Sequence, residues 1–254
     1  MRFGVCASVR DVEQVARAGF DYLECPVTEL ALMVEADFRE AVGRLRDSAV
    51  GAEACNLFFP GLRMTGPEVD RTALSEYVKK ALDRVSRAGA AVVVLGNGGL
   101  RAVPDGWPVA DARQQLMDTL RLIGEGCGPY GITVVLEPLN KKETNLVNSV
   151  AEGLEMVRAV AHPRVKLLAD YYHVRMESED SSSIQAAGEW IEHLHFANGI
   201  ARRYPQAESE DDYRPFVNAC KAIGYARRLS LEAGTDDFAA EAPAALRVMK
   251  ALFS

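Results

Sequence analysis

Two patterns of apolar residues alternate along this chain. Short apolar runs, which are typical of buried strands, are predicted at 2–7, 20–25, 51–59, 90–95, 132–137, 165–170, 191–197 and 228–233. Between them, apolar residues recur every three or four positions, as in Leu74, Val78, Leu82 and Val85, and this spacing predicts a helix with one buried face. Helices are expected at 9–18, 38–46, 69–88, 109–126, after the N-cap Ser149, and at 238–253.

This alternation of strand and helix predicts a parallel sheet. Eight such units within 254 residues match the size of a (β/α)8 barrel, so we expect one α/β TIM barrel domain over residues 1–254. A doubly wound open sheet is the alternative. It is disfavoured because no dinucleotide-binding glycine fingerprint follows the first strand.

Charge and composition exclude several classes of function. The net charge of −7 disfavours nucleic acid as a partner, and no apolar run approaches the ~20 residues that span a bilayer. The five cysteines are widely spaced, without a C-x-x-C pair, and the N-terminal apolar run is too short for a signal peptide. We therefore expect a cytoplasmic protein with reduced thiols.

The last four predicted strands each end in a side chain that could bind a metal. They are Glu137, Asp170, His195 and Glu232, spaced one strand–helix unit apart. A period of two puts Thr133, Val135 and Glu137 on one face of the fifth strand. Because barrel active sites lie at the carboxyl ends of the strands, the four side chains could converge.

Three carboxylates that meet would repel one another unless a cation lies between them. Three oxygen donors and one imidazole suit Mn²⁺, Mg²⁺, Co²⁺ or Zn²⁺. The alternative is that the three carboxylates and the imidazole are unrelated and each pairs with a local partner. Their equal positions at the ends of four successive strands disfavour it.

Four short motifs resemble the xylose isomerase-like TIM barrel superfamily, and within it the ketose 3-epimerases (tagatose and psicose epimerases) and the related hydroxypyruvate isomerases. The motifs are Leu136-Glu137-Pro138-Leu139-Asn140, Ala169-Asp170-Tyr171-Tyr172-His173, His193-Leu194-His195 and Ser230-Leu231-Glu232. The layout of the whole chain is similar to that superfamily.

The resemblance implies one divalent ion, with Mn²⁺ the first choice, held by the four strand-end residues. It also implies that Glu137 and Glu232 are the catalytic acid–base pair. Glu143, His173 and Arg202 match substrate-binding positions. Arg203 is an alternative to Arg202, because the family spacing from the metal-binding histidine to the arginine is one residue shorter than in this chain. The glycine that follows the proline in the family is Gln206 here. A homodimer or homotetramer is implied by resemblance alone.

The implied chemistry is proton transfer next to a carbonyl, through a cis-enediolate. The ion would stabilise that anion, and carboxylates on both faces of the carbon would remove and return the proton. A small sugar or keto-acid is the expected substrate. Free and phosphorylated substrates both remain open. The glycine-rich segment 96–99 could let the backbone approach a ligand closely, which would suit a phosphate.

Four other functions compete. A hydroxypyruvate isomerase-type aldose–ketose isomerase and a lyase or dehydratase would use the same enolate chemistry. A zinc nuclease would need more than the four histidines present. A non-catalytic sugar-binding barrel would not need the intact ligand set. We expect His193 to be buried and hydrogen-bonded, whereas Glu24 and Asn56 either touch substrate or only line the pocket.

Overall fold

Eight parallel strands close into a barrel in chain order, because β1 pairs with both β2 and β8. The computed structural model describes residues 1–254. The strands are β1 Arg2–Cys6, β2 Tyr22–Pro26, β3 Ala52–Asn56, β4 Val92–Leu95, β5 Thr133–Leu136, β6 Val165–Asp170, β7 Ile191–Phe196 and β8 Arg228–Leu231. The predicted (β/α)8 barrel is confirmed and the open sheet is not.

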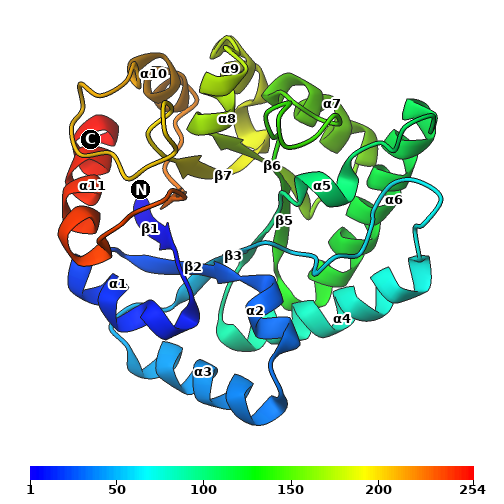
Figure 1. The fold of residues 1–254 in the computed structure, drawn as a ribbon, viewed down its shortest axis with the longest axis horizontal. Helices are drawn as coiled ribbons and strands as arrows, with labels where there is room; N and C mark the ends of the chain where they lie inside the picture. Colours follow the sequence, from blue (N-terminus) through cyan, green and yellow to red (C-terminus); the bar gives the residue numbers. More distant parts are fainter.

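Helices surround the barrel (Figure 1). The α-helices are α1 Val12–Ala18, α2 Val27–Leu32, α3 Glu35–Asp47, α4 Arg71–Ala88, α5 Gly98–Arg101, α6 Val109–Cys127, α7 Val150–Val160, α8 Tyr171–Met176, α9 Ser182–Ala187, α10 Arg214–Ala222 and α11 Phe238–Phe253. Three 3₁₀ turns complete the set: η1 Val9–Asp11, η2 Gly128–Tyr130 and η3 Gly188–Trp190. None of the helices is both long and apolar enough to cross a bilayer.

The longer elements lie where the apolar pattern predicts them, whereas α2, α5, α8, α9 and α10 were not predicted. Each of these helices has nine residues or fewer, too few turns for a helical period to stand out. The third strand was predicted too long, at 51–59. It ends at Asn56 because Leu57 has a left-handed backbone, with φ of +48°, which cannot continue a strand.

Side chains on the two faces of the strands enter two separate cores. The inner core fills the barrel and consists of Tyr22, Ala54, Val92, Val94, Val135 and Leu168. The outer core of 69 residues lies between the strands and the helices, and Val93, Leu95, Val134 and Leu136 belong to it. Because alternate residues face inward, Val135 is followed on the inner face by Glu137, as predicted.

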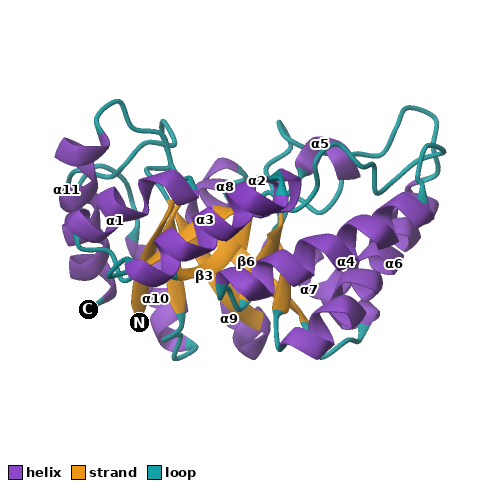
Figure 2. Ribbon diagram, turned by 90° about the horizontal axis from the view of Figure 1, so that it is seen from below, coloured by secondary structure: helices purple, strands orange, loops and turns teal.

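The carboxyl ends of the strands open onto one edge of the barrel. α2 follows β2 directly and α5 follows β4 after Gly96 and Asn97, and both helices lie with the longest loops along that edge (Figure 2). The inward-facing residue at the end of each strand therefore points toward the space between these loops.

Candidate active site

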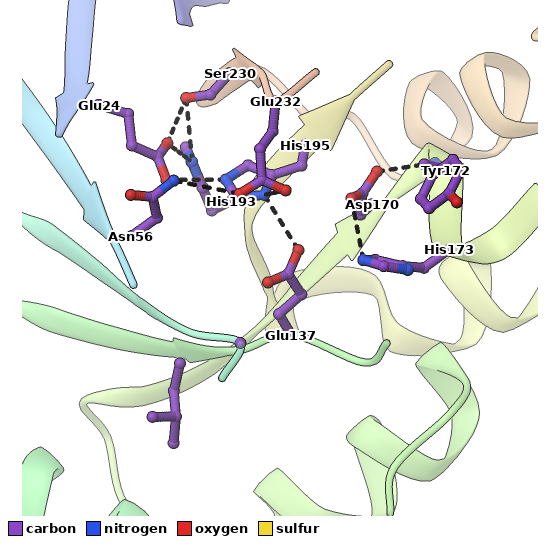
Figure 3. Close-up of polar contacts among 12 residues, drawn as sticks. Glu24, Asn56, Glu137, Asp170, Tyr172, His173, His193, His195, Ser230 and Glu232 are labelled. Atoms are coloured by element: carbon purple, nitrogen blue, oxygen red, sulfur yellow. Dashed lines mark hydrogen bonds and ion pairs between the residues drawn. The ribbon is translucent and has the colours of Figure 1, made fainter. Parts of the chain in front are cut away.

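The structure brings the four predicted strand-end side chains together. One ligand atom from each of Glu137, Asp170, His195 and Glu232 lies within 4.8 Å of the others. They come from the neighbouring strands β5, β6, β7 and β8, and Figure 3 shows them facing a common space. Three carboxylates and one imidazole therefore form a cluster that could hold a single metal ion.

The sheet fixes the backbone of these residues. Asp170 ends β6, His195 is the penultimate residue of β7, and the two glutamates come directly after β5 and β8. The Glu137 N–H donates to Leu95 O at 3.2 Å, and the Glu232 N–H donates to Phe196 O at 3.0 Å. The parallel hydrogen bonding thus extends one residue beyond each of these strands, so both carboxylates stand on rigid backbone.

Room for the Glu137 side chain comes from Gly96, at the end of β4. A Cβ atom on Gly96 would overlap Glu137 Oε2, so any other residue would displace the carboxylate. The close backbone approach expected of this glycine segment therefore exists, but the group that approaches is a protein carboxylate.

Arg101 supports the backbone at the same part of the site and was not predicted. Its guanidinium is fully buried and donates to Gly96 O at 2.8 Å and to Glu137 O at 2.7 Å. It joins the carboxyl ends of β4 and β5 through main-chain oxygens. No sequence signal distinguishes such a buried arginine from a surface one.

The two nitrogens of His195 face opposite ways. Nδ1 lies 3.2 Å from Glu137 Oε1 and 3.5 Å from Glu232 Oε2, whereas Nε2 lies 2.9 Å from Glu24 Oε1. His193 lies deeper, with its Nε2 2.7 Å from Glu24 Oε2, so the prediction of a buried, hydrogen-bonded histidine is confirmed. Glu24 thus lies beneath the cluster, away from the mouth of the site.

Among the buried atoms at the site that lack a hydrogen-bond partner are Asp170 Oδ2 and His173 Nε2, which lie 3.5 Å apart. Asp170 Oδ1 accepts from Tyr172 N at 2.8 Å, and His173 Nδ1 accepts from Asn140 N at 3.2 Å. Because His173 Nδ1 is an acceptor, Nε2 carries the proton of the neutral ring and is available to donate to a ligand.

The electrostatics of the cluster are those of crowded anions. Burial first, and then the neighbouring carboxylates of Glu137 and Glu232, together raise the pKa of Asp170 to about 7. Burial and Glu232 also raise the pKa of Glu137. Burial opposes ionisation of Glu232 as well, but His195 and Arg202 outweigh it and lower the Glu232 pKa to about 2. A cation bound at the centre would relieve this repulsion.

Of the two adjacent arginines, Arg202 is the one that reaches the cluster. Its Nη2 lies 2.7 Å from Glu232 Oε2 and its Nη1 lies 3.1 Å from Glu143 Oε1. The guanidinium lies over the Tyr172 ring, 4.8 Å from the centroid. Arg203 instead pairs with Asp236, so it faces away from the site.

A cavity of about 420 Å³ opens beside Glu232. Its walls are Cys6, Ala7, Ser8, Pro26, Asn56, Leu57, Arg202, Glu232, Ala233 and Gly234. The Asn56 amide donates to Glu232 Oε1 at 3.2 Å, so this residue lines the pocket and contacts an acidic side chain of the cluster. Arg202 and Glu232 are the charged residues of this wall.

Comparisons with known proteins agree with this geometry. The chain is 28% identical over 231 residues to D-psicose 3-epimerase of Ruminiclostridium cellulolyticum, covering 84% of this chain and 74% of that protein. It is 26% identical over 245 residues to L-ribulose 3-epimerase of Mesorhizobium japonicum, covering 91% of this chain and 77% of that protein.

A solved structure with the same fold is D-psicose 3-epimerase with D-tagatose from Clostridium cellulolyticum H10. The TM-score is 0.87 at 20% identity, and the match covers 100% of both chains. The sequence model of one family matches residues 12–252, nearly the whole barrel, including all four strand-end residues. The chain therefore belongs to the xylose isomerase-like TIM barrel family.

Proposed function

We propose that this protein is a divalent-metal-dependent sugar epimerase, with a ketose 3-epimerase as its most specific assignment. The observation that carries the proposal is the meeting of Glu137, Asp170, His195 and Glu232 within 4.8 Å at the carboxyl end of the barrel. The ketose 3-epimerases among its relatives support the same reaction class.

The residues present fit one divalent ion. Asp170 Oδ2 is buried without a partner, and three carboxylates with one imidazole form a donor set suited to Mn²⁺, with Mg²⁺, Co²⁺ and Zn²⁺ as alternatives. When bound, such an ion would act as a Lewis acid toward the oxygens of a keto sugar. Glu137, Asp170, His195 and Glu232 would hold it.

Glu137 and Glu232 are proposed as the acid–base pair. They reach the site from β5 and β8, on the two sides of β6 and β7, so a carbon between them could lose a proton to one and regain it from the other. A positioned carboxylate is typically worth ~10² to 10⁴ in rate for each transfer. Two such groups on opposite sides of one carbon would invert it.

His173, Arg202 and Glu143 are proposed to bind the sugar. Burial and the nearby Arg202 lower the pKa of His173 to about 3, so its ring is neutral at pH 7. Its Nε2–H can then donate to a hydroxyl or carbonyl oxygen. Arg202 and Glu143 are already paired at 3.1 Å and offer further donors and acceptors at the mouth.

The cavity lining favours a free ketose over a phosphorylated one. Its single cation, Arg202, is already paired with Glu143 and Glu232, and the other walls are small and uncharged apart from Glu232 itself. A phosphate would therefore find no unpaired cation in this wall, which is unfavourable for binding its charge. The volume of about 420 Å³ lies within the range of small-molecule sites.

The test is a panel of ketoses in deuterated water with Mn²⁺, followed by NMR. Deuterium at C3 with the epimer as product would support the proposal. Exchange at C1 or C2 with an aldose product would instead indicate the aldose–ketose isomerase, and loss of water would indicate a dehydratase. No exchange with any free ketose, together with turnover of a phosphorylated one, would overturn the preference for free sugar.

Glu232→Gln should abolish the exchange while leaving the thermal unfolding cooperative. Asp236→Asn, in the same loop but paired with Arg203, is the matched control and should exchange as the wild type does. Unchanged turnover in Glu232→Gln would remove Glu232 from the mechanism. A dimer or tetramer remains a prediction, which sedimentation of the purified protein would measure.

A further inference from the structure

A second polar cluster lies inside the barrel, below the four strand-end residues. It consists of Tyr22 and Glu24 on β2, His193 on β7 and Ser230 on β8, each with 0% of its surface exposed. Figure 3 shows Glu24, His193 and Ser230 grouped on the far side of His195 from Glu137. Buried polar groups are costly unless they are hydrogen-bonded, so this cluster needs an explanation.

Glu24 is the centre of this cluster. It reaches across the barrel from β2 to β7, where its Oε1 lies 2.9 Å from His195 Nε2 and its Oε2 lies 2.7 Å from His193 Nε2. Ser230 Oγ donates to Oε2 at 2.5 Å, and Tyr22 Oη lies 2.7 Å from Ser230 Oγ. Of its two oxygens, Oε1 has His195 as its partner and Oε2 has His193 and Ser230.

The direction of each hydrogen bond follows from the chemistry of these groups. An ionised carboxylate only accepts, so His193 Nε2 and His195 Nε2 must each carry a hydrogen. Ser230 uses its one hydrogen on Glu24, and Tyr22 therefore donates to Ser230. The consequence for His195 is that its Nε2–H is held by Glu24, so Nδ1 is the nitrogen left to bind an ion in the upper cluster, after losing any proton that it carries.

Nδ1 is the nitrogen that faces the proposed metal ligands, at 3.2 Å from Glu137 Oε1 and 3.5 Å from Glu232 Oε2. Histidines that bind metals generally donate their other N–H to a carboxylate or carbonyl, which fixes the tautomer and the ring orientation. Glu24, His195 and the proposed ion would then form such a series through the barrel.

Gly4 makes room for this arrangement. A Cβ atom on Gly4 would overlap the Tyr22 ring, so β1 leaves space for the tyrosine whose hydroxyl ends the hydrogen-bonded series. The lower barrel is therefore shaped around a polar group, where apolar side chains would otherwise fill the interior.

We propose that Glu24 is a positioning residue, which holds His195 as the Nε2–H tautomer and aims its Nδ1 at the divalent ion. This inference rests on the metal site of the proposed function. It adds a residue from β2, on the opposite wall of the barrel, to a site whose ligands all come from β5 to β8.

Glu24→Gln tests the proposal. The amide keeps the shape, but its NH₂ group would face an imidazole N–H, so it cannot accept from both histidines. We expect the affinity for Mn²⁺, measured by the loss of the free-ion electron paramagnetic resonance signal, to fall roughly 10- to 100-fold. Glu53→Gln, on the neighbouring β3 and paired with Arg228 instead, is the matched control and should bind as the wild type does.

The outcomes separate this proposal from the metal site itself. Wild-type protein that binds no Mn²⁺ overturns the metal site and the proposal together. Wild-type binding of one ion with unchanged affinity in Glu24→Gln overturns only the role of Glu24. If the wild type binds two ions per chain and Glu24→Gln loses one of them, Glu24 is itself a metal ligand, and its role as a positioning residue is overturned.

A second measurement does not depend on the variant folding. In Zn²⁺-loaded wild-type protein labelled with ¹⁵N at histidine, the His195 shifts should indicate Nδ1 bound to the ion and a hydrogen on Nε2. A hydrogen on Nδ1 with Nε2 bound would overturn the proposal. Ser230→Ala removes one donor to Glu24 but leaves the His195 contact, so its Mn²⁺ affinity should fall less than that of Glu24→Gln.

Discussion

The Arg202 guanidinium lies 2.7 Å from the Glu232 carboxylate, whereas its neighbour Arg203 pairs with Asp236 outside the cluster. Arg202 has a left-handed backbone, with φ of +50°, and its carbonyl accepts from Gly234 N at 2.8 Å. This local pairing between the loops after β7 and β8 decides which arginine points inward.

This relationship predicts that the two arginines differ in function. Arg202→Gln removes a charged hydrogen-bond donor, worth about 1.5–3 kcal/mol, so kcat/KM for the preferred ketose should fall roughly 10- to 100-fold. Arg203→Gln removes an exposed ion pair and should stay within about twofold of wild type. Steady-state kinetics would check both, and a larger loss in Arg203→Gln would contradict the assignment.

Gly96 should be needed for metal binding. Gly96→Ala places a Cβ against Glu137 Oε2 and pushes the carboxylate out of the cluster, so we expect Mn²⁺ affinity to fall at least about tenfold, the lower end of the effect seen when ligand support is lost. Gly99, three residues further on, has open space where its Cβ would be. Gly99→Ala is therefore the control, and isothermal titration of both variants should separate them. Equal affinities would mean that Glu137 can move without cost.

Metal affinity should depend steeply on pH. Burial acts to lower the pKa of His195, but Glu24 and the nearby carboxylates raise it well above its usual value, so binding at Nδ1 must displace a proton near neutral pH. Because the pKa of Asp170 is about 7, metal binding below that pH must also displace a proton from the Asp170 carboxyl. As pH is lowered, the apparent affinity for Mn²⁺ should therefore fall about tenfold per unit while pH is above 7, and more steeply once pH is below 7. Titrations in buffers of different ionisation enthalpy would count the released protons, and a flat profile would contradict this.

Asp170 should destabilise the metal-free protein at high pH. Its pKa rises from an ordinary value of 3.8 to about 7 in the folded state. The stability that this carboxyl contributes is present below about pH 4 and is lost as pH rises through 7. Asp170→Asn removes this cost, so at pH 8 with a chelator it should be more stable than wild type by about 1–4 kcal/mol, while Mn²⁺ should no longer raise its Tm.

Urea unfolding of the wild type and Asp170→Asn at pH 5 and pH 8 would check this prediction. The difference between the two proteins should grow with pH. Equal midpoints at pH 8 would show that another group carries the proton.

Much of the fold and the cluster could be predicted from local pattern. The strand predicted at 165–170 coincides with β6 at both ends, because a short apolar run is typical of a buried strand and is too short for a helix. Glu137, Asp170, His195 and Glu232 could be grouped from sequence because parallel strands in a closed barrel end at one edge, so equal positions in successive units must be neighbours.

Other features depend on contacts that no local pattern encodes. Glu24 meets His195 across the barrel, between strands that are not hydrogen-bonded neighbours, and Arg101 reaches the Glu137 carbonyl from a four-residue helix too short to predict. The amino-acid sequence by itself determined the barrel and the four strand ends, since these follow from the period of apolar residues and the order of the strands. Tertiary structure alone decided the contacts of Glu24 and Arg101 that support the site, because the direction of a buried polar side chain depends on which distant partner is there to satisfy it.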